Sequence, residues 1–149
     1  MTTLRSLAWM GVLAALVTLG STLARAQQDG FIRIAPDEVQ FKGDSKGIQQ
    51  AVLYGDPAKP GLYVIRVKFP PGVMSRPHTH NTDRMVIVVK GPWFTGTSKV
   101  FDPATTVPVP TAGFMIHPAG AVHYDGAKGE EVIVQITGMG PVVTTPVQP

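Results

Sequence analysis

Two histidines separated by a single residue are the feature of this sequence that most clearly suggests chemistry. They are His78 and His80, in the segment Arg76-Pro77-His78-Thr79-His80. In an extended strand alternate side chains point to the same face, so the two imidazoles would share one face. A third histidine, His123, follows a Pro-x-Gly turn and can join them from a neighbouring strand. Three neutral imidazole nitrogens can hold one divalent ion, and Fe, Mn, Zn, Ni and Cu all remain open.

An arginine follows the histidine pair at a spacing that would place its side chain in the same site. Arg84 has the same parity as His78 and His80, so without a bulge its side chain points to the same interior. A guanidinium does not deprotonate in proteins and is repelled by a dication, so an anion should accompany it. The candidates are Asp83, Asp125 and a carboxylate or phosphate of the substrate, which arginine binds bidentately. The alternative is an Arg84 that points outward and pairs on the surface.

No other residue stands out as a catalytic group, and the catalytic residues are left unassigned. Tyr124, Asp125 and Asp83 are the nearest candidates for acid–base chemistry. His117 precedes a proline, and we expect it to be a structural or rim residue rather than a ligand. Asp56 precedes another proline, which is typical of turn chemistry.

The spacing of these residues resembles the two sequence motifs of the cupin superfamily. Residues 72–91 follow the first motif, G-x5-H-x-H-x3-E-x6-G, except that Arg84 stands at the glutamate position. Residues 118–123 follow the core of the second motif, P-x-G-x-x-H. Gly113 lies one residue from its usual place, and Ala127 replaces the closing asparagine.

The resemblance implies an all-β fold, a double-stranded β-helix that forms a small jelly-roll-like barrel. It implies that His78, His80 and His123 hold one divalent metal ion and that the pocket accepts a small organic molecule. The glutamate ligand does not carry over to Arg84, which we assign to substrate binding instead. Three-histidine sites without this glutamate occur in the superfamily, among them thiol and β-diketone dioxygenases, so we still expect a metal.

Short strands must position these residues. Residues 62–69 alternate strictly: Tyr63, Ile65, Val67 and Phe69 are apolar, whereas Arg66 and Lys68 point the other way. No ten-residue segment after the N-terminus shows a helical period, which favours a sandwich or barrel. Residues 102–110 are expected to form a connection, and the tail from Gly138 is expected to fray. The other predicted strands cover residues 48–54, 85–90, 93–97, 113–117, 122–124 and 131–137, with short extended pieces at 31–34 and 39–41.

Composition and the N-terminus limit the classes of function. The 149 residues include no cysteine, which excludes thiolate catalysis, disulfides and cysteine-ligated metals. The net charge is +3, without a run of Lys or Arg, so nucleic acid is not an expected partner. Residues 1–26 read as a secretory signal peptide, with Arg5, an apolar stretch over 7–19 and the cleavage site Ala24-Arg25-Ala26. We therefore expect residues 27–149 to form a single cupin domain, periplasmic or secreted, and not membrane-bound after cleavage.

Two classes of function fit these observations. The first is a metal-dependent enzyme that binds a small anionic substrate and acts as a dioxygenase, an isomerase or a lyase. The second is a non-catalytic periplasmic module that binds or senses a small molecule or a metal. A homodimer is also expected, since cupin-like chains often pair.

Overall fold

The computed structural model describes residues 30–148, and the predicted signal peptide over residues 1–26 lies outside them. Residues up to Ile34 form a part of their own, separate from the unit Ala35–Pro149. The extended pieces predicted at 31–34 and 39–41 are wrong, because neither pairs as a strand. A strand needs a partner for its backbone N–H and C=O groups, and Pro36–Glu38 (η1) forms a 3-10 turn between the two segments instead.

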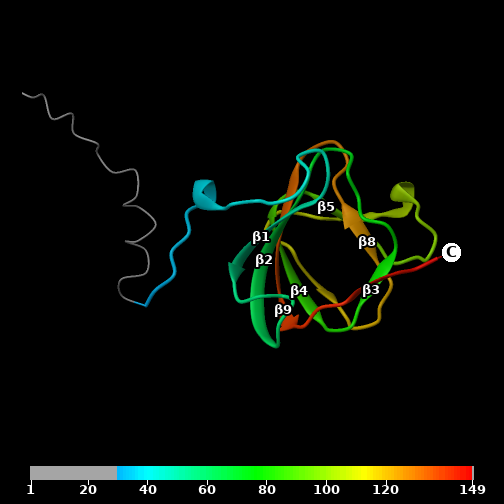
Figure 1. Ribbon diagram of the computed structural model, residues 1–149. Helices are drawn as coiled ribbons and strands as arrows, with labels where there is room; N and C mark the ends of the chain where they lie inside the picture. The colour runs from blue at the N-terminus through cyan, green and yellow to red at the C-terminus, as the bar shows by residue number, and fades with distance from the viewer. Residues whose placement is uncertain (1–29, 149) are drawn as a thin grey trace, which may run out of the picture. The chain divides into compact units, whose positions relative to one another are not determined.

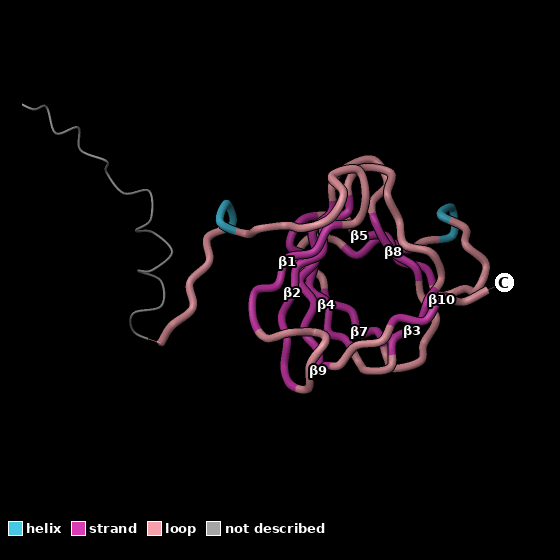
Figure 2. Tube along the Cα trace, in the orientation of Figure 1, coloured by secondary structure: helices cyan, strands magenta, loops and turns pink. Residues whose placement is uncertain are grey.

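Within residues 30–148, ten short strands form three antiparallel sheets. The five-stranded sheet has the order β1-β2-β9-β4-β7, the three-stranded sheet the order β6-β5-β8, and β10 pairs with β3. Figure 2 shows the five-stranded sheet curving along one side, with β5, β8, β3 and β10 opposite it. The bounds are β1 Gln49–Tyr54, β2 Gly61–Phe69, β3 His78–His80, β4 Arg84–Lys90, β5 Trp93–Gly96, β6 Val107–Val109, β7 Phe114–His117, β8 Tyr124–Gly126, β9 Val132–Gly140 and β10 Thr144–Pro146, and a second 3-10 turn, η2, covers Pro103–Thr105.

Strand alternation decides which side chains reach the interior. The predicted alternation of β2 is confirmed: Tyr63, Ile65, Val67 and Phe69 are buried, and the residues between them are not. Strand β9 buries every second residue in the same way, and β4 buries Arg84, Val86 and Val88. Each buried aliphatic side chain stabilises the fold by about 1.5–3 kcal/mol. The interior face therefore combines an apolar core with one charged residue, Arg84.

The predicted fraying of the tail is wrong, and this difference matters for the site. Strand β9 extends to Gly140, and β10 pairs with β3 in the register Thr144↔His80. The backbone N–H of Val147 also donates to the carbonyl of Pro77 (2.9 Å). Backbone pairing over the histidine strand thus holds a segment whose composition alone suggests disorder (Figure 1).

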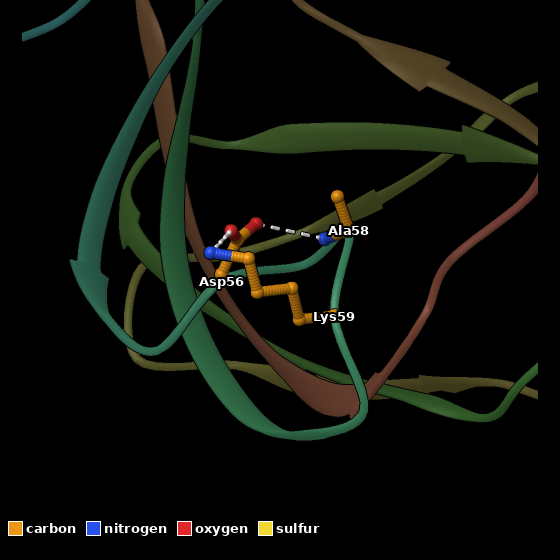
Figure 3. A network of polar contacts seen from close by, with 3 residues as sticks. All are labelled: Asp56, Ala58 and Lys59. Carbon is orange, nitrogen blue, oxygen red and sulfur yellow. Dashed lines mark hydrogen bonds and ion pairs between the residues drawn. The ribbon is translucent and has the colours of Figure 1, made fainter.

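The loop between β1 and β2 contains the turn predicted at Asp56. Its carboxylate accepts a hydrogen bond from the backbone N–H of Ala58 (2.9 Å) and pairs with the Lys59 ammonium (3.1 Å; Figure 3). These contacts lower the pKa of Asp56, chiefly through the Ala58 hydrogen bond. Asp56 is therefore a turn residue. No helix within residues 30–148 has the length and hydropathy to cross a membrane.

Candidate metal and anion site

Strand pairing brings the three predicted histidine ligands together. His78 and His123 lie directly opposite each other and exchange two backbone hydrogen bonds, of 2.9 and 3.0 Å. Directly opposed residues of an antiparallel pair project to the same face, and His80 follows two residues along the same strand. The ring centroids are 4.4 Å apart for His78 and His123, 4.8 Å for His78 and His80, and 5.2 Å for His80 and His123.

Backbone carbonyls set the tautomers of two of these rings. His78 Nδ1 lies 2.7 Å from the carbonyl oxygen of Arg76, and His123 Nδ1 lies 3.0 Å from that of Ala121. A carbonyl oxygen only accepts hydrogen bonds, so Nδ1 of each neutral ring carries the proton. The lone pair is then on Nε2, and His123 Nε2 is buried without a hydrogen-bond partner. Metal-binding histidines are commonly oriented in this way.

Arg84 points into the interior and contacts the third histidine. Its side chain is 9% exposed, and its guanidinium donates a hydrogen bond to His80 Nε2. Because His80 Nε2 accepts this bond, Nδ1 of the neutral ring carries the proton and donates to Thr144 Oγ1 (3.1 Å). Both nitrogens of His80 are therefore in use, unlike those of His123.

Arg84 lies within a row of paired residues that crosses the five-stranded sheet. In the strand register Tyr63 pairs with Gly138, Gly138 with Arg84, and Arg84 with His117. A Cβ added at Gly138 would lie 2.6 Å from the Tyr63 hydroxyl and 2.9 Å from its Cζ. Glycine thus leaves the space through which the Tyr63 ring extends toward Arg84. Tyr63 Oη and Arg84 Nε are both buried without a hydrogen-bond partner.

Neither protein carboxylate that was a candidate partner forms an ion pair with Arg84. Asp83 is exposed, and its carboxylate accepts a hydrogen bond from the backbone N–H of Ala119 (2.7 Å). Asp125 is buried and faces the same cavity as Arg84. Among the carboxylates of residues 30–148, none forms an ion pair with the guanidinium. Asp125 nevertheless attracts the guanidinium across the cavity, because each charge favours the ionised form of the other group.

The structure buries His117 beside the other histidines, which excludes the rim position, whereas a structural role stays a prediction. The side chain is 3% exposed, and its ring centroid lies 3.8 Å from that of His123. Both of its ring nitrogens are buried without a partner. Parity along β7 is the signal that could have revealed it, since Phe114 and Ile116 are exposed while His117 points inward.

Tyr124 does not belong to the site, although it adjoins His123 in sequence. Its hydroxyl donates to the carbonyl oxygen of Asp102 (3.0 Å) and lies 3.2 Å from Thr105 Oγ1. The ring is fully buried beside the turn η2. Of the three acid–base candidates, Asp125 is the one that lines the cavity.

The polar residues face a small cavity. It has a volume of about 120 Å³, and its polar lining consists of Ser75, His78, Arg84, His117 and Asp125, with Trp93 among the apolar residues. A water molecule takes about 30 Å³ of liquid, so the cavity has room for roughly four waters or one small polar group. A wider depression of about 420 Å³ adjoins it and shares Ile48, Ser75 and His78.

Burial keeps the histidines neutral. It lowers the pKa of His80 to about 3, that of His117 to about 2 and that of His123 to about 4. The positive charge of Arg84 lowers all three pKa values further. Burial also raises the pKa of Asp125, although His78 and Arg84 oppose this rise. Neutral imidazole is the form that binds a metal, so the cluster fits a divalent ion.

The donor atoms form two sets that share one histidine. One nitrogen from each of His78, His80 and His123 lies within 4.8 Å of the others. The same limit holds for His117, His123 and the Asp125 carboxylate. Imidazole and carboxylate donors suit Fe, Mn, Zn, Ni and Cu, so the donor chemistry fits a metal without selecting one.

These sheets define the class of fold: the protein has the double-stranded β-helix fold of cupin structures. The chain belongs to the family described as "Domain of unknown function (DUF4437)", whose model matches residues 36–146. No curated protein matches the sequence.

Solved structures support the fold at low sequence identity. The polyketide cyclase RemF from Streptomyces resistomycificus matches with a TM-score of 0.65 and 14% identity, over 78% of this chain and 85% of its own. KdgF from a Halomonas species matches with a TM-score of 0.55 and 17% identity, over 72% and 92%. A cupin-2 domain from Rhodospirillum rubrum matches with a TM-score of 0.58 and 16% identity, over 78% of both chains.

Proposed function

We propose that this protein is an exported metal-dependent cupin enzyme that binds a small anionic organic substrate. The observation that carries the proposal is the buried guanidinium of Arg84, which has no carboxylate partner among the described residues and adjoins converging neutral histidines. A buried unpaired charge costs several kcal/mol, so a site that keeps one is suited to a ligand of opposite charge. The similarity to a polyketide cyclase is compatible with an enzyme, but it concerns the fold alone.

His78, His80 and His123 are the residues we assign to the ion. When bound, a divalent ion would supply a Lewis acid, or a place for substrate and dioxygen together. The chain itself orients two of the rings through hydrogen bonds from Nδ1 to backbone carbonyls, and burial keeps the His80 and His123 rings neutral.

Arg84 is the residue we assign to the substrate. A carboxylate that accepts two hydrogen bonds from the guanidinium would compete with His80 Nε2 for the same donor atoms. Substrate binding would then release His80 as a metal ligand. The small cavity accepts the anionic group, and the adjoining depression, about 420 Å³, accepts the rest of the molecule.

Anion binding to Arg84→Ala tests this assignment. Calorimetry with acetate, pyruvate and benzoate as probes should show at least one that binds the purified protein. Arg84→Ala should weaken that binding by about 1.5–3 kcal/mol, the value of a hydrogen bond to a charged group. Unchanged binding in Arg84→Ala, or no binding of any probe to the parent protein, would contradict the assignment.

Turnover separates the enzyme from the second candidate, a non-catalytic periplasmic binding or sensor module. The absence of an assigned general base favours the module. Protein purified from its own host should carry one metal ion per chain and convert a carboxylate substrate with or without dioxygen. Tight binding of a small molecule with no conversion would favour the module.

Export is a separate part of the proposal. The predicted signal peptide rests on Arg5, the apolar stretch and Ala24-Arg25-Ala26. Mass spectrometry of the protein made in its own host should show an N-terminus at Gln27. A full-length chain retained with the membrane would contradict the periplasmic assignment.

A further inference from the structure

The second donor set is more buried than the first and contains three of the seven buried side-chain atoms of the described residues that lack a hydrogen-bond partner. His117 and His123 are 3% and 2% exposed, and three of their four ring nitrogens have no hydrogen-bond partner. The Asp125 carboxylate completes the set, is 6% exposed and lines the same cavity as His117. Buried polar atoms without partners are costly, so their concentration around one point indicates a missing partner.

The first donor set is blocked at one of its three members. His80 accepts from Arg84 at Nε2 and donates to Thr144 at Nδ1, so it offers no lone pair while these contacts last. A dication there would also face the Arg84 charge with no carboxylate among its own ligands. The inner set, His117, His123 and Asp125, has neither disadvantage to the same degree, because three of its four ring nitrogens are free and Asp125 supplies a carboxylate.

We propose that, in the anion-free protein, a divalent cation is held by His117, His123 and Asp125 rather than by the histidine pair His78 and His80. This inference rests on the proposed function, in which an anion draws Arg84 away from His80. The nitrogen of His80 then becomes available, and the outer set of His78, His80 and His123 can bind the ion. His123 belongs to both sets through one free nitrogen, Nε2, so a single ion occupies one position or the other. Two imidazoles and a carboxylate are a donor combination suited to Fe, Mn or Zn.

Zinc titration of matched variants in a buffer free of carboxylates and phosphate tests the inner position. Asp125→Asn and His117→Gln should weaken zinc binding roughly tenfold or more, whereas His80→Gln should leave it nearly unchanged. Asp83→Asn is the matched control, because Asp83 lies nearby on the surface and belongs to neither set. Circular dichroism and a cooperative thermal transition establish that each variant folds.

Imidazole nitrogen NMR of the unmutated protein gives a readout that does not depend on folding of a variant. The chain has four histidines, so each ring can be followed separately during the zinc titration. The nitrogens of His117 and His123 should shift on binding, and those of His80 should keep their metal-free positions.

The outcomes separate this inference from the proposed function. Loss of affinity in His80→Gln, with zinc binding intact in Asp125→Asn and His117→Gln, overturns the inner position and leaves the outer three-histidine site standing. Equal losses in all three variants overturn it as well, because one site would then use both sets. Zinc that binds the parent protein and every variant equally, or not at all, contradicts a metal in the cluster and with it the proposed function.

Discussion

Replacing Arg84 by methionine should stabilise the metal-free protein while removing its affinity for anions. The guanidinium is buried, forms no ion pair with the described carboxylates and leaves Nε without a partner. Methionine keeps much of the length of the side chain and suits a cavity lined by Val134 and Ile136. The change therefore removes a buried charge without leaving a large void.

Two opposing effects set the size of the change. Removing a buried charge that forms no ion pair relieves a desolvation penalty of several kcal/mol, part of which the attraction of Tyr63 and Asp125 already offsets. Losing the charged hydrogen bond to His80 costs about 1.5–3 kcal/mol. The net expectation is a gain of about 1–3 kcal/mol, and at roughly 2–4 °C per kcal/mol for a chain of this size the Tm should rise by about 2–12 °C.

Thermal unfolding of the metal-free protein, with and without a carboxylate probe, measures both halves of this prediction. Arg66→Met is the matched control, because Arg66 lies on the opposite face of β2, where it donates to Gln135 (3.3 Å), and its change should stay within about 0.5 kcal/mol. A bound carboxylate should raise the Tm of the parent protein and of Arg66→Met, but not that of Arg84→Met. A clearly lower Tm in Arg84→Met would refute the reasoning, since it would make Arg84 a structural residue with adequate partners.

Two further predictions concern the interior row and the pH response. Gly138→Ala should destabilise the protein by about 1–3 kcal/mol in urea unfolding, because its Cβ would lie 2.6 Å from Tyr63 Oη. Tyr63→Ala should relieve this clash. Equal stability of Gly138→Ala and the parent protein would contradict the packing. The metal-free protein should lose stability as the pH falls from about 6.5 to about 4. Three histidines take up protons in the unfolded chain there but not in the folded one, so the loss is on the order of 1 kcal/mol per pH unit for each. The raised pKa of Asp125 acts in the opposite direction but involves one group against three, and urea unfolding at pH 7 and pH 5 measures the balance. A flat profile would show that these imidazoles are not kept neutral by burial.

Local periodicity predicted the parts of the fold and site that depend on a single strand. The alternation of residues 62–69 and the shared face of His78 and His80 both follow from the two-residue repeat of a strand. Parity with His78 and His80 also predicted an inward Arg84; its side chain is buried, although bends at 81–82 separate β3 from β4 and the two strands belong to different sheets. The motif spacing added the fold class and the partner histidine, His123.

Features that depend on register between distant strands could not be predicted in this way. The row from Tyr63 through Gly138 to His117 joins three sequence-distant strands to Arg84, and no local pattern encodes that alignment. The pairing of β10 with β3 is a similar case, since Gly- and Pro-rich composition suggested a frayed tail. Thr144, whose hydroxyl accepts the hydrogen bond from His80 Nδ1, was missed for the same reason.

Zinc binding to the metal-free protein and to its His123→Ala variant tests the central claim most directly, because His123 is the one residue that both donor sets share. Calorimetry should show one ion per chain for the parent protein, and His123→Ala should weaken the affinity by roughly tenfold or more. The variant should still unfold cooperatively, which shows that the loss belongs to the site. Zinc affinity that is unchanged in a folded His123→Ala variant, or a parent protein that binds no ion, would contradict a metal centre in this cupin.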